Sequence, residues 1–394
     1  MAKESSARLS NRKVWAILAL VFISMVLRPP VAAVGPILRN IISDLGLTPF
    51  QSGLLAALPV LCFGLGAFAA PWLVRKLGLD NAFTAILLTL AVGIALRGLW
   101  DYSILLIGSL VVGLAIALSN VLLPTMIRAE FPDRISQMTA IYTSLLALFA
   151  SVGATLAVPV MQVLKSWQGS LAIWAIPAAI AVFAWLMMNR KQHHQNIELD
   201  HVQTSGSSIW KSPITWAIVG FFGLQSMNFY SILNWLPTIL VSKGFTVTEA
   251  GSLLGLTTLV GIPAGLAITT NLPKFKSVPA LAVIISVVTS LGMLMLLGHG
   301  WLAIAGCVVV GLGLASSFPL SLALIAIKAT TQERTTQLSA ISQGAGYLIA
   351  AIGTFAVGAS QAVFGNWTVA ILFLAAGALG QASMGAYAGS NRKL

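Results

Sequence analysis

A single arginine lies within the first long apolar stretch of the chain. Arg28 falls about midway along the run from Val14 to Leu38 and is followed directly by Pro29 and Pro30. If this run crosses a bilayer, the guanidinium costs about 2.5–3.5 kcal/mol on insertion scales and cannot shed its charge. The two prolines remove two backbone donors and free carbonyls of the preceding turn, so they predict a helix break. A guanidinium beside such a break could bind an electron-rich group of a solute.

No acidic residue is placed to neutralise Arg28. A structural ion pair with a buried carboxylate is therefore disfavoured, and two alternatives remain. Arg28 either binds an anionic or strongly electronegative solute, or it is satisfied by helix-end carbonyls and polar side chains. Because Asp, Glu and His are absent from the middle of the apolar runs, a side-chain proton relay is also hard to build. The ten acids all fall in predicted loops, tails or helix ends: Glu4, Asp44, Asp80, Asp101, Glu130, Asp133, Glu198, Asp200, Glu249 and Glu333.

A second group of polar and aromatic residues lies inside a later apolar run, at FFGLQSMNFYSILNWLP. Gln225 and Phe229 are spaced i and i+4, so they would share one helix face. Each polar residue in such a run has an alternative role as an interhelical hydrogen bond. The candidates for a binding site are Asn120, Tyr142, Gln225, Asn228, Phe229, Tyr230, Asn234, Trp235, Ser316, Ser317, Gln343 and Tyr347.

Composition places these residues in a membrane protein. The chain of 394 residues is 58% hydrophobic and only 8% charged, against about 25% charged in a soluble domain, and its mean hydropathy is +0.92. The net charge of +12 does not indicate nucleic acid, because the basic residues form short clusters between apolar runs. Cys62 and Cys307 fall inside apolar runs and read as small buried hydrophobes. No metal-ligand cluster, phosphate loop or catalytic constellation is present, so we expect no enzyme activity, metal or cofactor.

Twelve apolar stretches of about twenty residues predict twelve transmembrane helices in an all-α protein. The first is too long for the apolar region of a cleavable signal. The long polar segment 189–212 divides the chain into an amino-terminal six-helix bundle, 1–188, and a carboxy-terminal one, 213–394. The predicted spans are 14–38, 51–73, 82–100, 104–127, 137–163, 169–188, 213–241, 249–271, 278–298, 301–327, 336–363 and 367–388.

The basic residues predict the orientation. The two tails and the loops after even-numbered spans hold 17 of the 22 Lys and Arg residues. Both termini and the 189–212 loop are therefore expected on the cytoplasmic side. Arg97 and Arg128 lie near span ends, where we expect them to extend to the membrane interface.

The two halves also share residues at a constant offset. Residues at 46–58 return at 244–256, an offset of 198, and residues at 134–153 return at 334–353, an offset of 200. Trp167 and Trp367 are also 200 apart. Matches at nearly half the chain length indicate a duplicated six-helix unit, in which a solute site is expected near the midplane between two bundles.

This pattern resembles the major facilitator superfamily over nearly the whole chain. The hallmark loop after the second helix is partly matched, because Arg75, Lys76 and Gly78 are kept while the usual aspartate is Val74. The resemblance implies a gating role for this basic loop, and the missing aspartate puts its usual ion pair in question.

Within that superfamily, four strings resemble the cyanate and 2-nitroimidazole permeases: VLRPPVAAVGPIL, SNVLLPTMIRAEFP, GLQSMNFYSILNWLPTIL and SAISQGAGYLIAAIG. The resemblance implies a secondary active or facilitative transporter in a bacterial cytoplasmic membrane. Its solute would be a small anionic or nitrogen-containing molecule held around Arg28. The alternative is an efflux pump for nitroimidazole-type or other weakly polar aromatic compounds. We expect a monomer whose partners are the solute and the lipid bilayer, without nucleic acid.

Overall fold

The computed structural model describes residues 2–66, 69–99, 101–189, 207–275, 277–329 and 332–390. This part of the chain is almost entirely helical. Its helices are α1 (Ala2–Leu27), α2 (Pro29–Ala32), α3 (Val34–Leu45), α4 (Pro49–Gly66), α5 (Ala70–Leu77), α6 (Leu79–Leu96), α7 (Tyr102–Glu130), α8 (Ile135–Leu164), α9 (Trp167–Ala172), α10 (Ala175–Asn189), α11 (Ser207–Lys211), α12 (Pro213–Ser242), α13 (Val247–Asn271), α14 (Val278–Met295), α15 (Trp301–Lys328), α16 (Gln332–Phe364) and α17 (Thr368–Gly389), with 3₁₀ turns at Pro132–Arg134 and Leu272–Lys274.

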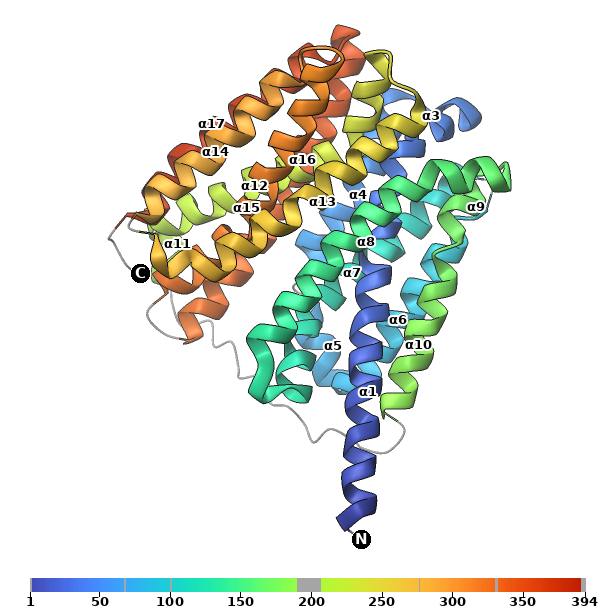
Figure 1. The fold of residues 1–394 in the computed structure, drawn as a ribbon, viewed down its shortest axis with the longest axis vertical. Helices are drawn as coiled ribbons and strands as arrows, with labels where there is room; N and C mark the ends of the chain where they lie inside the picture. Colours follow the sequence, from blue (N-terminus) through green and yellow to red (C-terminus); the bar gives the residue numbers. More distant parts are fainter. Residues whose placement is uncertain are drawn as a thin grey trace.

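The helices form two groups that lie side by side (Figure 1). Helices α1–α10 make one group and α11–α17 the other, and they meet where α3, α4 and α8 pack against α12, α16 and α13. This is the architecture of two six-helix bundles predicted from the sequence. The boundary at 189–212 stays a prediction, because residues 190–206 lie outside the described residues.

Eleven described helical segments are long and apolar enough to cross a membrane. Helix α12 is not among them, although its 30 residues exceed the roughly 20 that a bilayer core requires. Gln225, Asn228 and Asn234 lower its hydropathy, and all three are buried. Because these polar side chains are buried among other helices, they are not exposed to lipid. We therefore assign α12 as the remaining span of the predicted twelve.

The outside of the molecule is apolar, as a lipid-facing surface requires. Trp301, Val163 and Val363 are 84%, 82% and 76% exposed. Monomeric soluble proteins seldom leave so many large apolar side chains uncovered. Lipid is therefore the solvent of this surface.

The first predicted span is interrupted, as its two prolines indicate. Helix α1 ends at Leu27, Arg28 lies outside the helices with φ −111°, and α2 is a single turn that starts with Pro29 and Pro30. The amides of Val31 and Ala32 both donate to the carbonyl of Arg28, at 3.1 and 2.9 Å. Arg28 therefore sits at a break in mid-span rather than within a regular helix.

The duplication is visible in the way the second span of each half begins. Before α4, the amide of Thr48 donates to Gln51 Oε1 at 2.9 Å, and the amide of Gln51 donates back to Thr48 Oγ1 at 3.3 Å. Before α13, Thr246 and Glu249 exchange the same two bonds at 2.8 and 3.2 Å. These are reciprocal capping boxes at an offset of 198. Each follows a glycine of positive φ: Gly46 at 60° and Gly244 at 94°.

Close helix contacts repeat between the halves as well. A Cβ built on Gly108 would lie 3.0 Å from the carbonyl oxygen of Gly93, and one on Gly306 would lie 3.1 Å from that of Gly292. In the same way Gly153 packs on Pro29 of the first span and Gly353 packs on Met227 of the seventh. The two bundles are therefore copies of one helix arrangement.

One of these contacts predicts a stability difference. A Cβ on Gly311 would clash with the carbonyl oxygen of Thr257, which belongs to a packed backbone and cannot rotate away, whereas a Cβ on Gly380 would meet only Leu224 Cδ1 at 3.4 Å. We expect Gly311→Ala to destabilise the protein by about 1–3 kcal/mol, the usual cost of overpacking. Gly380→Ala should be neutral or slightly stabilising. Thermal unfolding of both variants in the same detergent tests this, and equal melting temperatures would contradict the described packing.

Candidate substrate-binding site

A cavity of about 170 Å³ lies between the two groups of helices. Its lining comes from the break before α2 and from α8, α12, α13, α15 and α16. Water needs only about 10–15 Å³ by a comparable measure, so the space admits a small organic molecule or a hydrated anion. The cavity is therefore the candidate binding site.

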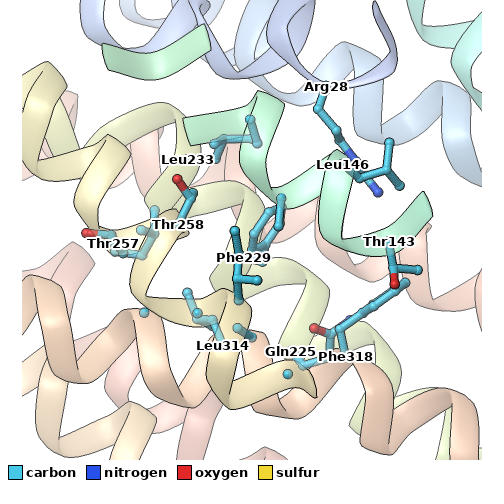
Figure 2. A pocket seen from close by; sticks show the side chains of 18 of the residues that line it. Arg28, Thr143, Leu146, Gln225, Phe229, Leu233, Thr257, Thr258, Leu314 and Phe318 are labelled. Atoms are coloured by element: carbon cyan, nitrogen blue, oxygen red, sulfur yellow. The ribbon is translucent and has the colours of Figure 1, made fainter. Parts of the chain in front are cut away.

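Arg28 reaches into this cavity from the helix break. Figure 2 shows its side chain extending beside Leu146 toward the open space. The guanidinium is partly buried, and its Nη1 donates to the hydroxyl of Tyr230 at 3.0 Å. Because Tyr230 belongs to α12, this bond joins the two halves at the cavity wall. The hydroxyls of Tyr142 and Tyr347 lie within electrostatic range of the same guanidinium.

The charge of Arg28 has no carboxylate partner in the described part of the chain. Its one hydrogen bond there is to the neutral hydroxyl of Tyr230, whereas a guanidinium carries five N–H donors. No Asp or Glu is among the residues lining the cavity. The site therefore offers a positive charge with donors to spare.

An aromatic cluster forms one side of the site. The rings of Tyr230 and Tyr347 lie 6.2 Å apart, and each meets Phe63, at 5.6 and 5.7 Å between centroids. Phe229 packs edge-on against Tyr230 at 5.1 Å, and Phe222 does the same against Tyr347 at 5.1 Å. These rings fix one another and give a flat solute an apolar surface next to the charge.

Hydroxyl and amide groups occupy other parts of the wall. Thr257 Oγ1 donates to Leu253 O at 2.7 Å and Thr258 Oγ1 donates to Gly255 O at 2.8 Å. Because each hydroxyl oxygen keeps acceptor capacity after donating, both can accept a bond from a solute. The Nε2 of Gln225 donates to Ser226 Oγ at 2.6 Å within the same wall.

The structure brings some of the sequence-predicted residues together and places others elsewhere. Arg28, Gln225, Phe229, Tyr230 and Tyr347 line the cavity. Gln225 and Phe229 do so from one face of α12, as their i, i+4 spacing predicts. The remaining candidates, which do not line it, are Asn120, Tyr142, Asn228, Asn234, Trp235, Ser316, Ser317 and Gln343.

All of these side chains except Asn228 have a hydrogen-bond partner in the described part of the chain. Tyr142 donates to Asn120 Oδ1 at 3.3 Å, and Gln343 Nε2 donates to Ser339 Oγ at 2.7 Å. Asn228 is fully buried, and both its side-chain polar atoms lack a hydrogen-bond partner among the described residues. A role for these eight residues as solute contacts stays a prediction.

The basic loop after the second span is only partly described. Lys76 is exposed and lies over the ring of Trp72, with Nζ 5.2 Å from the centroid. Gly78 has φ 75°, a conformation that favours glycine. The side chain of Arg75 lies outside the described part of the structure, so the gating role of this loop stays a prediction.

One interpretation of the sequence is wrong. Arg97 does not extend to the membrane interface, because it is only 2% exposed and its Nη1 donates to the carbonyl oxygen of Pro30. Position in the sequence suggested a span end, whereas the packing of α6 turns this side chain inward. The side chain of Arg128 lies outside the described part.

Several lining residues carry no sequence signal of their own. They are the threonines and serine of α8 and α13 and an aromatic residue of α15: Thr143, Ser144, Thr257, Thr258 and Phe318. Such residues are common in membrane spans, so composition alone does not single them out.

The amino-acid sequence matches the Major Facilitator Superfamily model over residues 14–354. The chain belongs to the major facilitator superfamily. As a member, it is a multi-pass membrane transporter and not an enzyme. Its fold is shared with a D-xylose-proton symporter, at 12% identity and a TM-score of 0.78, covering 94% of this chain and 97% of the symporter.

Two relatives are similar over most of their length. A 2-nitroimidazole transporter of Escherichia coli (strain K12) is 32% identical over 99% of both chains. The cyanate transport protein CynX of the same organism is 29% identical over 89% of this chain and 91% of its own. These similarities agree with the resemblance seen in the four sequence strings.

The unpaired charge predicts an unusual stability effect in this facilitator. We expect Arg28→Leu to raise the melting temperature, because it removes an intramembrane charge without a carboxylate partner among the described residues, and such a charge costs about 2.5–3.5 kcal/mol on insertion scales. Thermal unfolding of the purified protein in detergent measures this. A large fall in melting temperature would mean that Arg28 is held by structural partners, and Tyr230→Phe then identifies whether its hydroxyl is the partner.

Proposed function

We propose that this facilitator carries a small anionic or nitrogen-containing solute through a central site around Arg28. The observation that supports this most directly is a guanidinium that faces a cavity and has no carboxylate partner among the described residues. An intramembrane charge of this kind is costly, and such charges usually mark a solute or ion pathway. A solute with negative or electron-rich oxygen or nitrogen atoms would supply the missing acceptors.

The rest of the wall narrows the shape of the solute. Phe229, Tyr230 and Tyr347 give it an aromatic surface within reach of the Arg28 guanidinium. A flat molecule with an electronegative group at one end fits both features, with that group on Arg28 and its body against the rings. Two relatives are named as transporters of 2-nitroimidazole and of cyanate. Both compounds carry electronegative oxygen or nitrogen atoms that could accept hydrogen bonds from Arg28.

The aromatic wall also supports a second candidate function. A pump that exports weakly polar aromatic compounds would use the rings as its main contact and depend less on the charge of Arg28. Offset-stacked and edge-on aromatic contacts contribute about 0.5–1.5 kcal/mol each beyond area burial. Sensitivity of transport to Arg28 therefore separates the two functions.

The arrangement of contacts supports alternating access. Near the start of α13, Ser151 Oγ donates to Gly255 O at 2.7 Å and closes the gap between α8 and α13. Toward the other end of these helices the cavity continues past Thr143 and Leu266. The loops at that end carry most of the basic residues, which are predicted to be cytoplasmic. We infer an inward-open state, with both termini in the cytoplasm.

Transport by the purified protein in liposomes tests the main proposal. Labelled cyanate and labelled 2-nitroimidazole are the two probes. We expect Arg28→Ala to reduce cyanate transport by about 10–150-fold, the equivalent of losing a hydrogen bond to a charged group at about 1.5–3 kcal/mol. The transport rate of Arg28→Lys should lie between those of Arg28→Ala and the unmodified protein, because lysine keeps the charge but lacks the planar set of guanidinium donors.

The matched control is Arg39→Ala, which removes an exposed cation from the neighbouring helix α3. It should leave transport within about twofold of the unmodified protein, because an exposed charge contributes little. If Arg28→Ala transports cyanate normally, the anion site is wrong. If it loses cyanate transport but keeps that of 2-nitroimidazole, the aromatic-compound pump is favoured.

Alternating access makes a separate prediction at Gly255. A Cβ on Gly255 would clash with Thr155 Oγ1 and lie 3.2 Å from the carbonyl oxygen of Ser151. We expect Gly255→Ala to hinder closure of α8 on α13 and to slow transport at least about tenfold, while probe binding changes by less than about threefold. Gly380→Ala, which introduces the same methyl group at an open position, is the control. Unchanged transport by Gly255→Ala would contradict the need for this contact.

A further inference from the structure

Arg97 is a second buried arginine that the site described above does not use. It follows α6, is 2% exposed, and its Nε has no hydrogen-bond partner among the described residues. No Asp or Glu bond to it is present in the described part of the chain. A buried and unpaired guanidinium is costly. Its one described hydrogen bond, from Nη1 to the carbonyl oxygen of Pro30, therefore calls for a physical reason.

That carbonyl belongs to the single turn that follows Arg28. Helix α2 consists of Pro29–Ala32, has no side-chain cap and begins with two residues that lack an amide hydrogen. An isolated turn of this length does not hold its own shape. The turn is instead held from outside, by Arg97 on one side and by Gly153 of α8, where a Cβ would lie 2.7 Å from Pro29 Cα.

The other half of the molecule provides an internal comparison. Leu296 occupies the place of Arg97: both residues follow the third span of their half, with φ and ψ of −67° and −12° at Arg97 and −65° and −12° at Leu296. Gly108 packs against Arg97 in the same manner as Gly306 packs against Leu296. The two positions are therefore equivalent by geometry, at an offset of 199.

The first spans of the two halves differ in their course near this place. Gly153 packs on Pro29, and its equivalent Gly353 packs on Met227, so Pro29 and Met227 are equivalent positions. The next residue in each span, Pro30 and Asn228, therefore also correspond. Helix α12 runs unbroken through Asn228 from Pro213 to Ser242, so the carbonyl of Asn228 has the amide four residues later as its partner within the helix. The half whose first span is broken carries an arginine at this place, and the half whose equivalent span is continuous carries a leucine.

We propose that Arg97 is a positioning residue for Arg28. By donating to the carbonyl of Pro30 it holds the α2 turn, and the turn directs the guanidinium of Arg28 into the cavity. The part that concerns solute affinity rests on the function proposed above. Arg97 itself does not line the cavity, so it acts on the solute through Arg28.

The first experiment needs no solute. Hydrogen–deuterium exchange of the full-length protein in detergent reports on the amides of Val31, Ala32 and Ala33, which close the α2 turn. We expect Arg97→Leu, which installs the residue of the other half, to speed their exchange at least about tenfold. Arg97→Lys keeps a cationic donor and should fall between Arg97→Leu and the unmodified protein.

The matched control is Leu296→Ala. Leu296 is fully buried, so its truncation weakens packing at the equivalent place without touching α2. Exchange at residues 31–33 should remain within about twofold of the unmodified protein. Unchanged exchange at these amides in Arg97→Leu would overturn the proposal, and so would an equal increase in Leu296→Ala. If Arg97→Leu does not fold, the comparison between Arg97→Lys and Leu296→Ala decides.

The second experiment is a double-mutant cycle on equilibrium binding of cyanate and 2-nitroimidazole. We expect Arg97→Leu to weaken binding about tenfold when Arg28 is present. In an Arg28→Leu background the same change should have less than about a twofold effect, because its route to the solute is gone. Effects that multiply instead would show that Arg97 acts independently of Arg28 and would overturn the positioning role.

The two experiments separate the two proposals. If the unmodified protein binds neither probe, the proposed function fails for these solutes, and the exchange experiment still decides whether Arg97 holds the turn. If binding depends on Arg28 but not on Arg97, the proposed function stands and the positioning role is wrong.

Discussion

The guanidinium of Arg28 is held inside a lipid-surrounded protein without a carboxylate to neutralise it. A charge in this setting is tolerated only if it faces a polar or hydrated space and keeps hydrogen-bond partners. The helix break before α2, the Tyr230 hydroxyl at 3.0 Å and the cavity between the halves together meet that need. The arrangement leaves most donors of the guanidinium available, which is why the site suits an electron-rich solute.

The duplicated helix arrangement positions the site, and the residues proposed to bind the solute lie where the two halves differ. The capping boxes before α4 and α13 and the glycine contacts of the two halves follow one plan. The first and seventh spans do not, because one is broken at Arg28 and the other is a continuous helix that carries Gln225 and Tyr230. Two equivalent spans thus contribute a charge from one side and hydrogen-bonding and aromatic groups from the other.

Much of the candidate site was accessible from local sequence. Arg28 stood out because a charge in an apolar run is expensive wherever the run is placed, and its break followed from the missing amide hydrogens of two prolines. The shared face of Gln225 and Phe229 followed from helix geometry. The assignment failed to separate Asn228 from them, because a polar helix position carries no mark of which neighbouring helix it will face. Arg97 was misplaced for a related reason, since closeness to a span end does not show whether the end packs inward.

The sequence alone determined the membrane environment, the duplicated helical plan, the broken first span and the absence of a nearby acid in the chain, because each depends on composition or on contacts within a few residues. Only the tertiary structure decided which side chains line the cavity, that Tyr230 meets Arg28, and that Arg97 reaches Pro30. These depend on the rotation and packing of helices far apart in the chain, and in so uniformly apolar a sequence many rotations bury similar surface. The close glycine contacts select one of them by steric fit.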